Sequence, residues 1–419
     1  MLVAVPRVLG GLRKYREVAS LGLGSQVLNA LGVLALTLLG HAAADVYGAS
    51  GYISYAGVAG VAAGVLYPMV IGRPGFRWWR SAAAGGALFV LALGTFYAVI
   101  FARSGVYQGV GAPIGYSVVV LMAIGGALLT VAATYAVRLA CLGVPKAFAG
   151  ISIVPNLGLL LGTLLSALGL VVGAPAFLLL LPAIGWSLAC AAEVLVVREV
   201  NRRHSRIESV PIATGGSSHG LPTHASGLIM GLVVSTVVPP ALLSAIAPLG
   251  EGTIYWAAVI LKLSTSVVGL GVSSVLLVDY TWARRPEGSP RVLAGLALTA
   301  SVLLAGAVTI GPTIHEVGAT VLVALAMLIL YGIIIVVLRQ ANAERRSGRI
   351  LAKVLVDGAA SAFLVWALTQ SPSMTRFLAV FCVSYAVCIV MCTSGRSERM
   401  LKGLGFVTGT LAVALVVWV

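Results

Sequence analysis

Long apolar runs recur along the whole chain, and short polar segments separate them. A helix needs about 20 apolar residues to cross a hydrocarbon core about 30 Å thick, and a lipid-exposed backbone must satisfy its own polar groups. The pattern therefore predicts twelve membrane-spanning helices and a weaker thirteenth at the end of the chain. The predicted spans are residues 19–39, 52–71, 82–101, 115–137, 147–171, 174–197, 226–247, 252–278, 292–310, 317–338, 350–368, 377–392 and 404–419.

The composition excludes a soluble protein. Apolar residues make up 60% of the chain and charged residues 9%. Soluble domains carry about 25% charged residues, so a chain of this kind would leave too much apolar surface in water. We expect an all-α integral membrane protein.

The positive charges predict the orientation of the helices. If the N-terminus lies in the cytoplasm, only Arg103 and Arg376 fall outside, and Lys262 is the one cation assigned to neither side. This is the asymmetry of the positive-inside rule, so we expect a multi-pass protein of the cell membrane with a cytoplasmic N-terminus. The net charge of +15 then reflects loops that face an anionic leaflet rather than a nucleic acid.

The longest polar stretch, residues 198–226, follows the sixth predicted helix and is rich in Gly, Ser, Pro and charge. Such a composition predicts a linker, here on the cytoplasmic side. It divides the chain into an N-terminal lobe of six helices, the linker, a C-terminal lobe of six helices and a tail that carries the thirteenth segment. Their bounds are residues 1–197, 198–225, 226–395 and 396–419.

Two octets indicate an internal repeat. The sequence GYISYAGV from Gly51 and the sequence GTIYWAAV from Gly252 share Gly, Ile, Ala and Val in register. We expect each octet to open the second helix of its lobe. Two lobes of the same membrane orientation form a parallel repeat, and transporters build a central site between such repeats.

Three segments carry a resemblance to a known family: GSQVLNALGVLALTLLG at 24–40, YGASGYISYAGVAGVAAGVLYPMVIGR at 47–73 and PPALLSAIAPLGEGTIYWAAVILKLS at 239–264. They resemble the multidrug/oligosaccharidyl-lipid/polysaccharide exporter superfamily, most of all its polysaccharide-transporter branch of Wzx-like flippases. In that branch the first helix typically ends near a Tyr-Gly turn and the second leads to a basic loop, as at Tyr47, Gly48 and Arg73. The thirteenth segment departs from the twelve-helix pattern of the branch.

The resemblance implies two six-helix lobes around a central cavity that opens alternately to the two sides of the membrane. The substrate would be a polyprenyl-phosphate or polyprenyl-diphosphate glycan of polysaccharide biosynthesis, flipped from the cytoplasmic to the outer leaflet. Membrane lipids and this glycan would be the partners, and H⁺ or Na⁺ would be the coupling ion if transport is coupled. We expect a monomer that needs no cofactor and no metal.

Lys262 lies in the middle of the eighth predicted span. A charge at the bilayer centre costs about 3 kcal/mol or more unless it faces water, a cavity or a counter-charge. Ten helical residues from Gly252 carry Lys262 about 15 Å inward, half of the hydrocarbon core. We therefore expect it to face the cavity and to contact the lipid phosphate. Two alternatives stay open. The aliphatic stem of Lys262 could carry its ammonium group to the membrane–water interface. The ammonium group could instead pair with Glu193 or Asp357, which both lie nearer the cytoplasmic ends of their predicted helices.

Tyr255 and Ser266 would complete this part of the substrate site. They lie seven residues before and four residues after Lys262, so they fall near the same face of the helix. Ser266 is the closer companion, because residues four apart are in contact range.

The first lobe offers Gln26, Asn29 and Asn156 as further substrate-binding candidates. Gln26 and Asn29 share a helix face and would hydrogen-bond sugar hydroxyls or join neighbouring helices. Proline removes a backbone donor, so Pro155 predicts a kink in the fifth helix and Pro239 with Pro240 a break in the seventh. These kinks would act as hinges of the transport cycle or as static packing features.

The sequence does not favour an enzyme. The predicted outside loops are short, and no Gly-Lys-Ser/Thr loop is present to bind nucleotide phosphates. The main alternative is a cation-coupled multidrug exporter of the same superfamily. Such exporters generally require membrane-embedded acids, and Glu193 is the only nearby candidate in the first lobe, predicted away from mid-depth.

Overall fold

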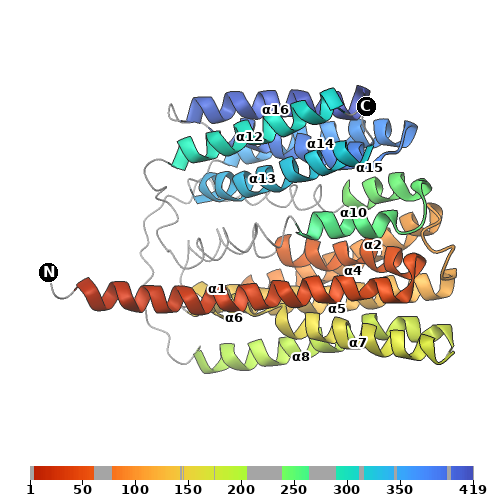
Figure 1. Cartoon of the computed structure of the whole chain (residues 1–419). Coiled ribbons are helices and arrows are strands. Elements are labelled where there is room, and N and C mark those ends of the chain that lie inside the picture. The colour runs from red at the N-terminus through yellow and green to blue at the C-terminus, as the bar shows by residue number, and fades with distance from the viewer. Residues whose placement is uncertain are drawn as a thin grey trace. The chain divides into compact units, whose positions relative to one another are not determined.

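The computed structural model of the protein describes residues 4–60, 78–141, 144, 146–173, 175–204, 238–263, 289–310, 316–343, 347–393 and 398–418. Helices and short connecting turns account for these ranges, and no strand occurs within them (Figure 1). The predicted all-α class is confirmed.

The described helices belong to two compact units, which divide between α8 and the helix Val238–Leu249. The first unit consists of α1 (Ala4–Ala35), the 3₁₀ turn η1 (Leu36–Leu39), α2 (His41–Gly60), α4 (Trp78–Arg103), α5 (Ala112–Cys141), α6 (Lys146–Ala149), α7 (Ile153–Val171), the 3₁₀ turn η3 (Ala176–Leu180) and α8 (Leu181–His204). Within it, α5 packs against α2, α4 and α8, while α7 packs between α8 and α1.

The second unit begins with Val238–Leu249, which ends in the 3₁₀ turn η6 (Ala247–Leu249). It continues with α10 (Thr253–Leu263), α12 (Ser289–Ile310), α13 (Glu316–Ala343), α14 (Ser347–Gln370), α15 (Met374–Cys392) and α16 (Arg399–Trp418). Helix α15 packs against α13, α14 and α16, and α12 packs against α13 and α16.

Ten helices in the described part of the chain are long and apolar enough to cross a membrane. They correspond to ten of the predicted spans, including the weak last one, so a multi-pass membrane protein is confirmed. The other three predicted spans, 52–71, 226–247 and 252–278, lie partly outside the described residues, and the count of twelve or thirteen stays a prediction.

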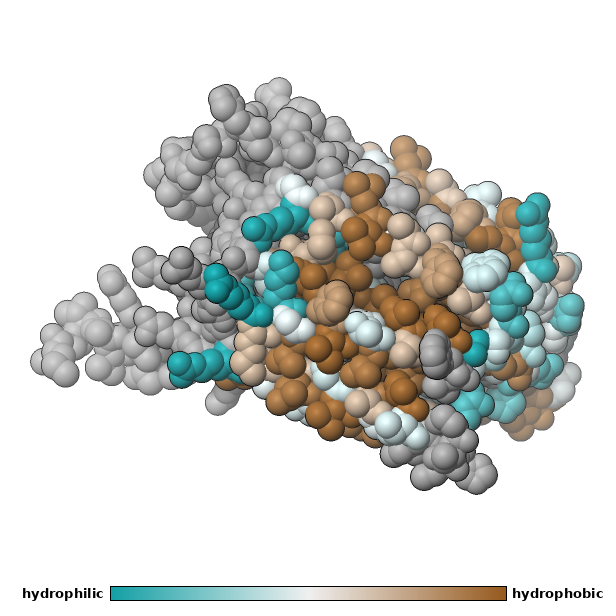
Figure 2. Space-filling model, turned by 90° about the horizontal axis from the view of Figure 1, so that it is seen from above, coloured by the Kyte–Doolittle hydropathy of each residue, from teal (hydrophilic) through white to brown (hydrophobic). Residues whose placement is uncertain are grey.

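The outer faces of these helices suit a lipid environment. Large apolar side chains are exposed along α12, α14 and α16, among them Val302, Phe363, Trp366 and Phe406. Figure 2 shows one face on which apolar residues occupy the middle and hydrophilic residues gather at the two ends. Soluble monomers rarely expose apolar patches larger than a few hundred Å², because water solvates them poorly.

The order of helix packing repeats in the two units. In the first, α4 packs on α5, α5 on α8 and α7 on α8; in the second, α12 packs on α13, α13 on α15 and α14 on α15. In each half, these three contacts join the third predicted span to the fourth, the fourth to the sixth, and the fifth to the sixth. Helix α16 has no counterpart in the first unit, and it packs along α12 and α15 as a full helix rather than a tail.

The structure does not place the two octets at equivalent positions in the two units. Tyr47 and Gly48 are helical residues of α2, and the chain turns earlier, at Gly40, where φ is 88°. The second unit has the same sequence of elements: a 3₁₀ turn, then Gly250 with φ 123°, then α10. Gly51 is therefore inside α2 while Gly252 precedes α10, so the octets occupy different positions in their helices and the turn glycines correspond instead.

Small residues let α7 and α8 approach closely. A Cβ at Gly158 would meet the carbonyl oxygen of Gly185, and a Cβ at Gly162 would meet that of Leu181. Gly158 and Gly162 form a Gly-x-x-x-Gly pattern, which suits membrane helices because backbones can then pack directly. This contact fixes one side of α8 and leaves its other side for α5.

Candidate functional site

Lys262 is the tenth residue of α10, and the described part of that helix contains no other charged residue. Its helical placement follows the prediction. The Lys262 side chain and the whole of Ser266 lie outside the described residues, so the phosphate contact stays a prediction.

Tyr255 is fully buried on α10, the helix that also carries Lys262. Its ring lies 5.3 Å from the ring of Trp256 in an edge-to-face arrangement, and Trp256 itself is exposed. Helix α10 packs on α15 in the same unit. In this conformation Tyr255 is a packing residue of the second unit, and a substrate could reach it only after a rearrangement.

One of the three candidates of the first unit, Asn156, lies where α7 meets α1. The Asn156 side-chain amide on α7 donates a hydrogen bond of 3.1 Å to the Ser25 carbonyl on α1. A Cβ at Gly32 would come within 3.6 Å of the Asn156 carbonyl oxygen, so the two helices touch again two turns later. Asn29 lies between Ser25 and Gly32 on this face of α1, since residues four and seven apart share a helix face.

Gln26 differs from these residues. Its Oε1 atom is buried and has no hydrogen-bond partner within the described ranges. A buried acceptor without a donor costs about 1–3 kcal/mol, so a hydroxyl donor at this place would be favourable. The structure thus supports helix joining for Asn156 and leaves Gln26 with unused hydrogen-bonding capacity.

The prolines have milder effects than predicted. Pro155 is the third residue of α7, where the backbone N–H has no partner within the helix and proline is tolerated. The break in the predicted span comes earlier, at residues 150–152 between α6 and α7. Pro239 and Pro240 are buried near the start of Val238–Leu249, and the segment before that helix lies outside the described residues, so the predicted break there stays a prediction.

A second polar region lies between α5 and α8. Only one of its residues, Glu193, was singled out from the sequence. Arg138 Nη1 on α5 donates a hydrogen bond of 2.9 Å to Asn201 Oδ1 on α8. Farther along, Ser187 Oγ on α8 donates a bond of 2.7 Å to the Leu121 carbonyl on α5. Residue numbers rise in the same direction on both helices, so α5 and α8 run parallel.

Glu193 lies between these two contacts. It is 6% exposed and shares the buried face of α8 with Cys190, Val197 and Asn201. Because α8 continues to His204, Glu193 lies near the middle of the helix. In the candidate span Ala176–His204 it lies nearer the C-terminal end, and its depth in the membrane stays a prediction.

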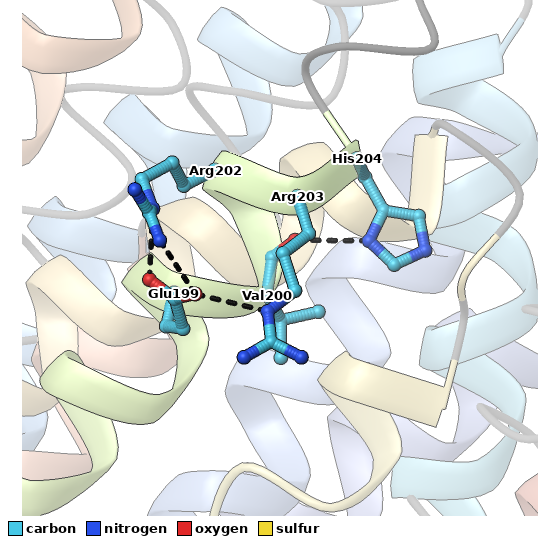
Figure 3. Close-up of polar contacts among 5 residues, drawn as sticks. All are labelled: Glu199, Val200, Arg202, Arg203 and His204. Atoms are coloured by element: carbon cyan, nitrogen blue, oxygen red, sulfur yellow. Dashed lines mark hydrogen bonds and ion pairs between the residues drawn. The ribbon is translucent and has the colours of Figure 1, made fainter.

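The second acid of α8, Glu199, lies near the end of the helix and differs from the buried Glu193. Glu199 is bonded by Arg202 and Arg203, each with an Nε to carboxylate oxygen distance of 2.9 Å (Figure 3). The His204 ring nitrogen Nδ1 lies 2.9 Å from the Val200 carbonyl oxygen. All of these contacts lie within one helix, and those of Glu199 are exposed, so Glu199 is a solvated surface acid.

The chain matches no model of a known protein family, no curated protein and no solved structure. Across the described ranges, no three histidine, cysteine or acidic side chains come together as metal ligands would. Only the residues and their placement therefore indicate the function of this protein.

Proposed function

We propose that the protein is a membrane transporter that flips a polyprenyl-linked oligosaccharide from the cytoplasmic to the outer leaflet. In this proposal the substrate site opens alternately to the two sides of the membrane. Lys262 meets the phosphate of the lipid carrier, and amide groups such as Gln26 meet the sugar.

The observation that carries the proposal is the position of Lys262 inside an apolar helix of a chain with ten described membrane-crossing helices. An anionic, hydrated headgroup must lose water to cross hydrocarbon, and a cation within the membrane offsets part of that cost. The three donors of an ammonium group suit phosphate oxygens as a point-charge contact.

The repeated packing order of the two units is further support. Repeated helix bundles are the usual way in which transporters form two alternative states around one site. The resemblance to Wzx-like flippases at 24–40, 47–73 and 239–264 supplies the substrate class.

A cation-coupled exporter is the second candidate, and one observation favours it. Such an exporter needs an acid within the membrane, and Glu193 lies in the middle of α8.

Reconstitution into liposomes tests the proposal and separates the two candidates. The purified protein is given a fluorescent polyprenyl-diphosphate sugar in one set of liposomes and a fluorescent cationic drug in another. Movement of the sugar lipid across the bilayer supports the flippase. Movement of the drug alone, driven by a pH or Na⁺ gradient, would support the exporter and overturn the flippase.

A further inference from the structure

Two arginines near the end of α8 share a single acid. Arg202 donates to the Glu199 carboxylate through Nε and Nη2, at 2.9 and 3.0 Å, and Arg203 donates through Nε at 2.9 Å (Figure 3). The other guanidinium nitrogens, Nη1 of Arg202 and both Nη atoms of Arg203, have no partner in the described part of the chain. These three residues, the α8 triad, therefore carry one surplus positive charge and keep donors that no protein group uses.

The α8 triad lies on the exposed side of its helix. The side chains of Arg202 and Arg203 are 66% and 75% exposed, and that of Glu199 is 40% exposed. A guanidinium group presents its N–H donors in a planar fork that matches two oxygens of a phosphate. An anion can therefore reach the unused donors without any change in the fold.

The same side of α8 is apolar where it precedes the α8 triad. Leu188 and Leu195 lie fourteen and seven residues before Arg202, spacings that return to about the same helix face. Both leucines are exposed, and so is Val196. Seven residues correspond to about 10 Å along the axis, so the exposed stripe changes from apolar to cationic over about that distance. A helix that leaves the hydrocarbon core for the headgroup region presents this change.

The neighbouring helix α7 does not extend along the end of α8. The two helices are antiparallel, because Gly158 meets Gly185 whereas the later Gly162 meets the earlier Leu181. Counting back from Gly158 places the start of α7 about level with Cys190 on α8. Helix α6, which precedes α7, packs on α5 and α1. The last turns of α8 thus extend past the start of α7, which leaves their exposed side open to lipid.

Other charges nearby increase the positive surplus. Arg138 on α5 is held beside the α8 triad by its bond to Asn201, the residue before Arg202. Arg198 is exposed on α8 one turn before Arg202. Glu199 is the only acid among these groups, so an anion would meet a net attraction here.

We propose that the α8 triad binds the phosphate of an anionic phospholipid in the leaflet at which α8 ends. The unused guanidinium nitrogens of Arg202 and Arg203 meet the phosphate oxygens, and Glu199 holds the two arginines side by side. The acyl chains lie along the exposed leucines of α8. A zwitterionic lipid binds less well, because its own cation lies close to the positive surplus. The inference does not depend on which substrate the protein carries.

Native mass spectrometry of the full-length protein in detergent tests the site, because it counts bound lipids. The protein is titrated with phosphatidylglycerol, which is anionic, and with phosphatidylcholine, which is zwitterionic. The wild type should bind phosphatidylglycerol at least tenfold more tightly. The double variant Arg202→Gln with Arg203→Gln should lose at least tenfold in affinity for phosphatidylglycerol. Since both arginines are exposed, this variant should keep the wild-type midpoint of thermal unfolding.

Arg399→Gln with Lys402→Gln is the matched control. It also removes two exposed cations, here near the start of α16, which is predicted to face the same leaflet. Its affinity for phosphatidylglycerol should stay within twofold of the wild type. Equal losses in the two double variants would show a general attraction of positive charge and overturn the site. An affinity that the arginine substitutions leave unchanged would overturn it too.

A soluble phosphate separates a lipid site from a site for free phosphate. Glycerol phosphate carries the same anionic group without acyl chains, so it should not displace phosphatidylglycerol at equal concentration. Displacement by glycerol phosphate would assign the α8 triad to a soluble anion and overturn the lipid site. Equal binding of phosphatidylglycerol and phosphatidylcholine by the wild type would show that the lipid charge is not recognised, which would also overturn it.

Discussion

Arg138 and Asn201 join α5 to α8 through a hydrogen bond of 2.9 Å between residues 63 positions apart in the chain. The guanidinium is partly buried, and the Asn201 side chain is buried at 6% exposure. The Asn201 amide oxygen accepts a hydrogen bond from one N–H group of the Arg138 cation, near the ends of α5 and α8. Its removal would leave Arg138 with an unmet donor in a region of limited water.

Replacement of Asn201 by leucine should therefore destabilise the protein. Loss of a partner for a partly buried charged group costs about 1–3 kcal/mol, so the midpoint of thermal unfolding in detergent should fall. Arg202→Ala is the control, because its bond to Glu199 is exposed and such surface pairs contribute about 0–1 kcal/mol. Equal midpoints for the two variants would show that the Arg138 contact adds no stability.

The contact between α7 and α8 predicts a strong effect at Gly162. An added Cβ would come within 2.8 Å of the Pro182 Cα atom, and backbone atoms cannot move aside as a flexible side chain can. Gly162→Ala should lower the free energy of unfolding by about 1–3 kcal/mol, the usual cost of overpacking.

Gly295→Ala is the matched control for Gly162→Ala. A Cβ at Gly295 on α12 would meet nothing within 4 Å, and alanine favours helix by up to about 1 kcal/mol over glycine. Thermal unfolding of both variants in detergent should shift in opposite directions. A Gly162→Ala protein as stable as Gly295→Ala would contradict the close approach of α7 and α8.

The predicted orientation can be measured with single cysteines in intact cells. Gln108 is exposed in the turn between α4 and α5, which should lie outside, whereas Ser217 belongs to the predicted cytoplasmic linker. An impermeant thiol reagent should label Gln108→Cys and leave Ser217→Cys unlabelled until the cells are opened. Labelling of Ser217→Cys from outside would reverse the topology.

Four of the five native thiols should interfere little with this measurement. Cys190, Cys382, Cys388 and Cys392 are buried, so an impermeant reagent does not reach them in the folded protein. The unsubstituted protein, carried through the same labelling, gives the background.

The hydropathy of the sequence predicted membrane helices well but not where they end. The sixth predicted span stops at residue 197 because charged residues follow, yet α8 continues to His204. Glu199 bonds Arg202 and Arg203 at spacings of three and four residues, and such pairs stabilise a helix beyond the lipid boundary. The helix therefore ends seven residues after the end of the predicted span.

Helix pairing could not be predicted from the same pattern. Asn156 contacts Ser25 across 131 residues, and nothing in the local sequence of either shows that α7 lies on α1. In membranes, partner choice depends on small-residue packing and polar contacts rather than on hydropathy. Polar candidates such as Gln26 and Asn29 could be chosen from the sequence, whereas the contact of Asn156 with α1 required coordinates.

Lys262 is the residue most central to the proposed transport, and its removal is the most direct test. Liposomes that contain the purified protein and a fluorescent polyprenyl-diphosphate sugar report movement of the sugar lipid between leaflets. Lys262→Ala should slow this movement about tenfold or more, equivalent to at least about 1.4 kcal/mol of barrier. Lys262→Arg should keep part of the rate, because the charge survives while its geometry changes. Lys402→Ala, at an exposed lysine of α16, should match the wild type. Transport by folded Lys262→Ala at the wild-type rate would contradict the role of this lysine.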